Sequence, residues 1–141
     1  MDTFIYQDSI INSCPIGDLI SYYSSKPKDL DKIKAIINHV FNGYKGLNSK
    51  FVELCRGGKC HDGKSIYELK IQLSKILIRI FFVPLENHAI MFDWLEKRHK
   101  PDYGKSESNK VDKKYLEKIE NTRVFYKKCL INNAYLKKVK F

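Results

Sequence analysis

Two stretches of the sequence carry side chains whose types and spacing could do chemistry. Residues 55–61 read CRGGKCH and place two thiols and an imidazole close together, and these are ligands that zinc prefers. Further along, Lys70 and Arg79 lie nine positions apart in two runs that have the pattern of β-strands. A lysine and an arginine side by side could hold a phosphate group. The first stretch therefore suggests a metal site, and the second suggests an anion-binding site.

The metal interpretation is the weaker of the two. Structural zinc sites use four ligands, usually as two pairs, whereas Cys55, Cys60 and His61 have the spacing Cys-x4-Cys-His and no second pair follows. A thiol nucleophile is also disfavoured, because neither cysteine has an obvious partner base and free cysteines usually pack as small apolar residues. We therefore expect no metal and interpret the glycines as a flexible connection between strands. The other possible ligands are scattered singly: Cys14, His39, His88, His99 and Cys129.

Length and composition predict one soluble domain over residues 1–141. A chain of 141 residues with 43% hydrophobic residues is long enough to bury a core without disulfides or metal. No apolar run approaches the roughly 18 residues that span a bilayer, so we expect no membrane partner. Residues 1–12 lack the pattern of an export signal, which predicts a cytoplasmic protein with reduced cysteines.

The charge of the chain favours a polyanionic partner. The formal net charge is +10, which suits RNA, DNA or an acidic protein. An alternative is that the many lysines only reflect the composition of an AT-rich genome. The arginines are fewer and more informative, because their planar guanidinium suits phosphate: Arg56, Arg79, Arg98 and Arg123.

The N-terminal half of the chain predicts a strand followed by two helices. Residues 3–7 form a short β-prone run, and a helix can begin at Pro15 because proline suits the first helical turn. The apolar residues between Ile33 and Phe41 have the spacing of one helical face, and Gly43 is placed to end that helix in a left-handed conformation. Residues 51–54 are a brief strand candidate.

The second half predicts a meander and a final helix. Residues 66–73 alternate between apolar and polar, residues 75–83 are almost wholly apolar, and residues 88–95 continue as a third strand. Residues 97–110 are polar and loop-like, and a helix is expected from about residue 112 to 130. The fold class is thus α+β, with an N-terminal strand, an αα-hairpin, an antiparallel three- to four-stranded meander and a C-terminal helix.

A tight turn at Ser74 and Lys75 would fix the pairing of the first two long strands. Paired residue numbers then sum to 149, which sets Lys70 directly opposite Arg79. Like charges opposed on a sheet cost a few tenths of a kcal/mol up to about 1 kcal/mol, and an anion between them removes that cost. By alternation, the third strand would add Phe92 and Trp94 to this face, followed by Glu96 and Arg98. Cations and aromatic rings on one sheet face are typical of a single-stranded RNA site.

The same residues also have a purely structural interpretation. An arginine in a strand is more often salt-bridged, and Arg79 could pair with Glu68, Asp93 or Glu96. Trp94 could belong to the core. The residues alone leave both interpretations open.

The string SIYELKIQLSKILIRIFFVPLENHAIMFDWLEKRHK resembles the central region of the RelE/ParE superfamily of toxins, especially the HigB-like, phage-associated branch. The shared pattern is an aromatic residue, Leu and a basic residue, then a turn, then Arg-Ile followed by aromatic residues, then a strand ending in basic residues. Tyr67, Leu69 and Lys70 open it, Arg79 stands in the middle, and residues 94–98 close it. The resemblance covers nearly the whole chain and leaves residues 131–141 as a possible extra tail.

The resemblance implies a RelE-like fold and a toxin of a type II toxin-antitoxin pair. Such toxins are endoribonucleases that cut mRNA, commonly on the ribosome, without a metal or other cofactor, and a co-encoded antitoxin, often a helix-turn-helix protein, holds them inactive. The RNA 2′-OH attacks the adjacent phosphorus, so the site needs cations, a proton acceptor and a proton donor. The implied catalytic residues are Lys70, Arg79, Arg98, Tyr103 and His99, and the expected RNA-binding residues are Arg56, His61, Trp94 and Lys97.

Two other functions are compatible with the same resemblance. ParE-type members inhibit DNA gyrase without this catalytic set. A phage or mobile-element protein could also keep the fold only to bind a partner, without catalysis.

Overall fold

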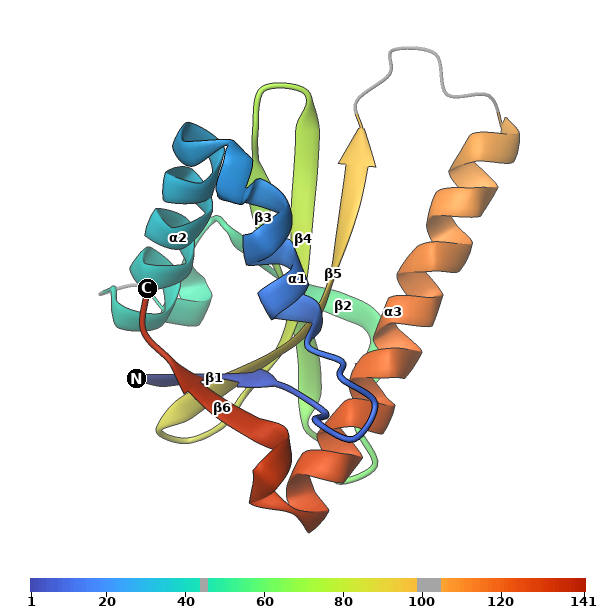
Figure 1. Ribbon diagram of the computed structural model, residues 1–141. Coiled ribbons are helices and arrows are strands. Elements are labelled where there is room, and N and C mark those ends of the chain that lie inside the picture. The colour runs from blue at the N-terminus through green and yellow to red at the C-terminus, as the bar shows by residue number, and fades with distance from the viewer. Residues whose placement is uncertain (44–45, 99–104) are drawn as a thin grey trace.

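The computed structural model describes residues 1–43, 46–98 and 105–141, apart from the side chains of residue 98 and of residues 105–112. A six-stranded sheet forms its centre, with the strand order β2-β3-β4-β5-β1-β6 (Figure 1). Strands β2 to β5 are an antiparallel meander, β1 runs parallel to β5, and β6 is antiparallel to β1. The bounds are β1 Asp2–Tyr6, β2 Val52–Lys59, β3 Ser65–Gln72, β4 Ile76–Pro84, β5 His88–Arg98 and β6 Leu136–Val139.

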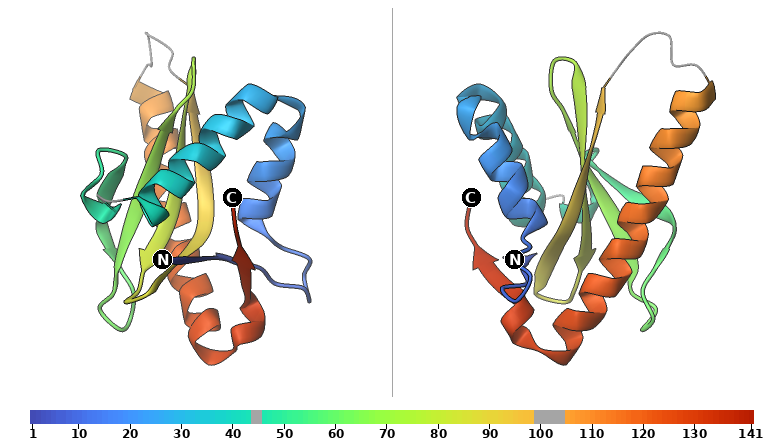
Figure 2. Two further views of the ribbon diagram at one scale, coloured as in Figure 1. Left: turned by 90° about the vertical axis from the view of Figure 1, so that its left-hand side faces the viewer. Right: turned by 45° about the vertical axis from the view of Figure 1, so that its right-hand side comes forward.

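Helices cover both faces of this sheet. The first two helices lie on one face and the third crosses the other, as the two views of Figure 2 show. The mixed α+β class expected from the sequence is therefore confirmed, and within the described residues no helix is long and apolar enough to cross a membrane. The α-helices are α1 Pro15–Tyr22, α2 Pro27–Asn42 and α3 Lys105–Ile131, and the short 3-10 helices are η1 Tyr23–Ser25, η2 Gly46–Asn48 and η3 Asn133–Tyr135.

Local sequence explains where the first two helices begin and how they bury one face. Pro15 and Pro27 each occupy the first helical turn, where the missing N–H of proline costs nothing. The expected left-handed end of α2 is wrong, because Gly43 has an extended backbone with φ −85° and ψ 166°. A glycine is favoured there for a different reason: a Cβ atom would collide with the carbonyl oxygen of His39.

Each face of the sheet has its own hydrophobic core. The core under α1 and α2 contains Leu69, Ile80 and Phe82 from the meander, packed against apolar residues of both helices. The core under α3 contains Phe81 and Phe92 from the sheet, together with the residues of α3 that reach it: Ile119, Tyr126 and Cys129.

A β-bulge in β5 reverses the alternation of its side chains. Phe81 pairs with Asp93 but the next residue, Phe82, pairs with Met91, so Phe92 is an extra residue in β5. A bulge of this kind moves every following side chain to the opposite face from the one that simple alternation predicts. Beyond Phe92 the odd-numbered residues of β5 therefore face α3.

Several predicted segments differ from the structure in their bounds or in the elements that they form. The strand predicted at residues 51–54 continues to Lys59, and α3 begins at Lys105 although residues 97–110 read as a loop. Polar lysine and glutamate are good helix formers, so the lack of an apolar period did not exclude a helix. Residues 131–141, interpreted as an extra tail, form η3 and β6, and β6 pairs with β1 from Thr3↔Val139 to Tyr6↔Leu136. The tail completes the sheet.

Candidate anion-binding site

The predicted pairing of β3 and β4 is confirmed. Lys70 lies directly opposite Arg79, and the pairs continue to Gln72↔Leu77. A hydrogen bond of 2.8 Å from the backbone N–H of Leu73 to the carbonyl of Ile76 closes the turn between them. The short turn thus fixes two cations side by side on the α3 face of the sheet.

These two cations lie in a hollow of about 300 Å³ between the sheet and α3. The hollow takes one basic residue from each of the four meander strands, and neighbouring strands in a sheet are about 4.8 Å apart. The cations therefore form a row across the sheet rather than a single pair. The lining residues are Glu53, Leu54 and Arg56 of β2, Glu68 and Lys70 of β3, Arg79 of β4, Lys97 of β5 and Tyr115 of α3.

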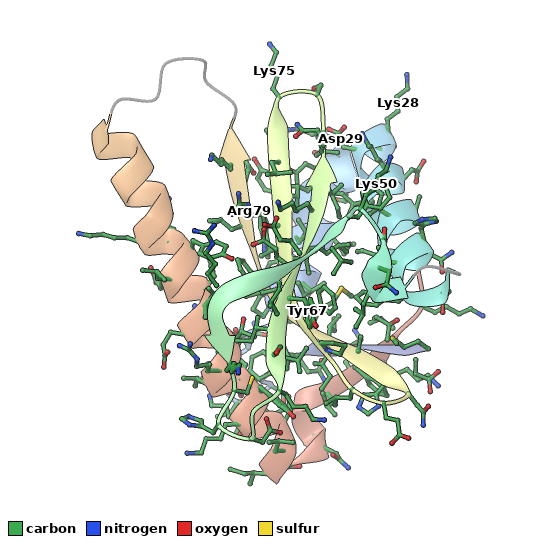
Figure 3. All side chains as sticks on the ribbon, turned by 180° about the vertical axis from the view of Figure 1, so that it is seen from behind. Lys28, Asp29, Lys50, Tyr67, Lys75 and Arg79 are labelled. Atoms are coloured by element: carbon green, nitrogen blue, oxygen red, sulfur yellow. The ribbon has the colours of Figure 1, made fainter. Side chains whose placement is uncertain are left out.

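The Arg79 side chain lies in the hollow, partly exposed and only loosely paired with acidic neighbours. Its side chain is 21% exposed, and its Nη1 lies 3.8 Å from Oε2 of Glu68, which is an ion pair but too long for a hydrogen bond. The guanidinium carbon is 5.4 Å from the ring centroid of Tyr115. In the described part of the chain, the buried Nε atom of Arg79 has no hydrogen-bond partner. Figure 3 shows Arg79 on the sheet between α3 and β2, far from Lys75 at the tip of the β3–β4 turn.

Lys70 is held by carboxylates on two strands. Its Nζ contacts Glu53 of β2 and lies 3.8 Å from Oε1 of Glu68, while its side chain stays 34% exposed. Burial, and then the positive charge of Arg79, lower the pKa of Lys70. The predicted repulsion between the two cations is thus present, and it is partly offset by acidic neighbours.

A buried polar group lies beneath the two cations. The Glu68 side chain is only 3% exposed, and Cys55 Sγ is 4.0 Å from its Oε2. Burial raises the pKa of Tyr115 far above its ordinary value, and hydrogen bonds to Cys55 and Glu68 act in the same direction. Burial likewise raises the pKa of Cys55 to about 12. The thiol and the phenol are therefore both neutral at physiological pH, and Cys55 is unsuited to act as a thiolate.

The prediction that Trp94 lies on the same sheet face as Lys70 and Arg79 is wrong. Trp94 packs against the core under α1 and α2, and its ring is 6.2 Å from that of Tyr22. Glu96, expected on the same face as Arg79, instead accepts a 3.4 Å hydrogen bond from Tyr23 Oη. The bulge at Phe92 is the reason, because it sends Lys97 to the hollow in place of its even-numbered neighbours. Phe92 itself is on the α3 face, as predicted.

Three predicted catalytic residues lie at the limit of the described structure. The backbone of Arg98 ends β5 and pairs with Ile76, but its side chain falls outside the description, and His99 and Tyr103 lie outside the described residues altogether. Their predicted roles stay predictions.

The CRGGKCH stretch belongs to β2 and its turn, and α3 clamps it. Arg123 of α3 donates a hydrogen bond of 2.7 Å to the carbonyl of Lys59 and another to that of Gly57. Tyr126 Oη donates a hydrogen bond of 2.7 Å to Asp62 in the turn. The interpretation as a flexible connection is therefore wrong for residues 55–59.

The histidine and the cysteines of this stretch do not converge on a site. His61 is exposed on the turn between β2 and β3 and is not among the residues that line the hollow. Cys55 and Cys60 are buried in the core under α3. Across residues 1–43, 46–98 and 105–141, no group of three or more histidine, cysteine or acidic side chains is arranged to hold a metal ion.

Sequence reasoning missed three lining residues. Glu53 and Leu54 come to the hollow only through the β2–β3 register, in which Glu53 pairs with Glu68. Tyr115 depends on where α3 crosses the sheet. A tyrosine early in a polar helix gave no signal of its own.

The described fold and site define a class, a small mixed α+β protein with a hollow on one sheet face that is lined by four basic and two acidic residues. Comparison of the chain with protein-family models, with curated proteins and with solved structures finds no match in any of the three. The function must therefore be inferred from the geometry of the site.

Proposed function

We propose that this protein is the toxin of a type II toxin-antitoxin pair, a metal-independent endoribonuclease that cleaves mRNA, and that its fold is a RelE-like layout extended by β6. The observation that carries the proposal is the cross-strand pair of Lys70 and Arg79 in a hollow with further cations on both sides. A co-encoded antitoxin and ribosome-bound mRNA are the proposed partners, as the resemblance of the central strands implies.

The proposed chemistry uses these cations on the scissile phosphate. The 2′-OH loses its proton and attacks phosphorus, the bond to the 5′ oxygen breaks, and that oxygen takes up a proton. The products are a 2′,3′-cyclic phosphate and a 5′-hydroxyl end. Arg79 offers a partly exposed guanidinium and Lys70 a partly exposed ammonium, and preorganised cations stabilise the extra charge of the phosphorane. Arg56 and Lys97 would hold the neighbouring phosphates.

The proposal assigns proton transfer to His99 or Tyr103, as the resemblance implies. Tyr115 lines the hollow beside Arg79. Because burial holds its pKa far above the ordinary value, Tyr115 keeps its proton at neutral pH and could donate a hydrogen bond but not act as a base.

The test is induced expression of the chain alone, with growth recorded and mRNA 5′ ends mapped. We expect growth arrest and new 5′-hydroxyl ends with the wild type, and loss of both with Arg79→Ala. Lys75→Ala is the matched control, because Lys75 is an exposed cation at the turn of the same strand pair and does not line the hollow. An Arg79→Ala variant that cleaves mRNA like the wild type would refute the catalytic assignment.

One observation favours a second function, a catalytically silent protein that binds a partner through the same fold. Lys70 contacts Glu53 and Glu68, and Arg79 is paired with Glu68, so part of the positive charge is already neutralised within the protein. This alternative predicts that expression leaves growth and mRNA intact.

A further inference from the structure

Glu68 is a buried carboxylate that the proposed cleavage chemistry does not use. It is 3% exposed and lies at the base of the hollow. Oε2 is 3.8 Å from Arg79 Nη1 and Oε1 is 3.8 Å from Lys70 Nζ. A buried carboxylate is costly to ionise unless cations compensate it. The two cations expected to bind phosphate are thus the same two that lie beside the Glu68 carboxylate.

Several other groups lie near Glu68 and influence its protonation equilibrium. Burial raises its pKa, and the charge of Arg79 and a hydrogen bond from Tyr115 oppose that effect. The thiol of Cys55 and the phenol of Tyr115 remain neutral because burial raises both pKa values. The charged groups that line the same hollow are Glu53 and Arg56 from β2, Lys70 from β3, Arg79 from β4 and Lys97 from β5.

A phosphodiester bound between Lys70 and Arg79 would change this balance. Its oxygens would share the cations, and its negative charge would lie within a few ångströms of the Glu68 carboxylate. In a site of low effective dielectric, two anions at that distance repel strongly. The cost is removed when one of them is protonated, as occurs in pairs of carboxylates that share a site.

We propose that Glu68 takes up one proton from solvent when a phosphodiester binds between Lys70 and Arg79, and releases it when the phosphodiester leaves. The proposal rests on the proposed function, because it identifies the ligand of the hollow as an RNA phosphate. Glu68 is then a positioning residue. It holds the guanidinium and the ammonium in place in the free protein, and it gives up its own charge when the RNA arrives.

The consequence is that RNA binding depends on pH through Glu68. The bound phosphate favours the protonated carboxyl, so affinity increases as pH falls toward the range where Glu68 protonates in the free protein. Uptake of one proton changes the dissociation constant by at most tenfold per pH unit. Because burial already raises the pKa of Glu68, this window lies above the ordinary range of a glutamate.

The test measures binding of a single-stranded RNA that cannot be cleaved, with 2′-O-methyl groups at every position. Fluorescence anisotropy from pH 5.5 to 8.5 at constant ionic strength gives the dissociation constant, and fixed salt is essential because phosphate contacts are salt-dependent. We expect the wild type to bind severalfold to tenfold more tightly for each unit of pH decrease over part of this range. Glu68→Gln, which resembles the protonated carboxyl, should lose most of that slope and bind at least as tightly as the wild type at pH 8.5.

Glu53→Gln is the matched control. Glu53 lines the same hollow and contacts Lys70, but its side chain is 57% exposed, so we expect the variant to bind more tightly and to keep the wild-type slope. Calorimetry of the wild type in two buffers of different ionisation enthalpy counts the protons taken up and does not depend on any variant.

The outcomes separate the two proposals. Binding without proton uptake, or an unchanged slope in Glu68→Gln, overturns the role of Glu68 and leaves the nuclease proposal standing. Proton-linked binding by a protein that does not cleave unmodified RNA supports Glu68 and overturns the nuclease. If the wild type binds no RNA at any pH, both proposals are wrong.

Discussion

The two faces of the sheet differ in how the helices are held against them. Under α1 and α2, the sheet residues Leu69, Ile78, Ile80 and Phe82 are fully buried, and the helices lie on them with an apolar face. Under α3 the buried residues that the helix contributes lie at helical spacing in its second half: Ile119, Thr122, Tyr126 and Cys129.

Near Tyr115 the α3 face becomes polar. Glu68, Lys70 and Arg79 occupy positions whose neighbours on the same strands are apolar on the other face. Polar contacts, rather than apolar burial alone, fasten this helix to the sheet, as the clamp of Arg123 on β2 illustrates. The face under α1 and α2 therefore contributes most of the apolar burial, whereas the face under α3 buries less apolar surface and leaves charged side chains accessible.

The largest expected change in stability comes from truncating a core residue on the α1 and α2 face. Phe82→Ala removes a fully buried ring and should lower the free energy of unfolding by about 3–5 kcal/mol. Urea unfolding followed by circular dichroism measures it. Lys70→Ala, on the neighbouring strand and the opposite face, is the comparison and should cost less than about 1.5 kcal/mol. Similar losses for the two variants would remove the distinction between the faces.

A smaller effect is expected from releasing the clamp between α3 and β2. Arg123→Ala removes the hydrogen bonds to the carbonyls of Gly57 and Lys59. We expect the free energy of unfolding to fall by about 1–2 kcal/mol, which is less than the contribution of fully buried charged hydrogen bonds because the Arg123 side chain is partly exposed. Arg123→Lys should not restore the loss, since an ammonium cannot reproduce the fork. Hydrogen exchange of the β2 amides should accelerate in both variants. Unchanged exchange would mean that β2 is held by β3 alone.

The smallest effect concerns the turn at Asp62. Tyr126→Phe removes the 2.7 Å hydrogen bond to this carboxylate and should cost about 0.5–1.5 kcal/mol at pH 7. Burial opposes ionisation of Asp62, but the hydrogen bonds from Tyr126 and from the Lys64 backbone outweigh it and lower the pKa. A carboxyl group whose pKa is lowered by folding stabilises the folded protein at pH values above its pKa in the unfolded chain. That stabilisation is lost as the pH falls through its pKa in the folded protein.

The difference between wild type and Tyr126→Phe should therefore shrink below pH 4. Thermal unfolding of both proteins from pH 3 to 7 tests this, and a difference independent of pH would show that the ring position matters more than the hydrogen bond.

The sequence by itself determined the features that depend on near neighbours along the chain. The Lys70–Arg79 pair follows from a tight turn and strict alternation, and the buried faces of α1 and α2 follow from apolar residues at helical spacing. These features are local, since a short turn leaves little freedom of register.

Only the tertiary structure decided which other residues share the hollow. The extra residue at Phe92 places Lys97 in the hollow, where simple alternation predicts Trp94, because a bulge shifts the alternation of side chains by one residue. No sequence pattern marks this bulge. Tyr115 and the clamp of Arg123 on β2 depend on where a mostly polar helix crosses the sheet, and Glu53 depends on the pairing of β2. Such contacts join residues far apart in the chain, so their position is fixed by packing of the whole molecule rather than by any local preference.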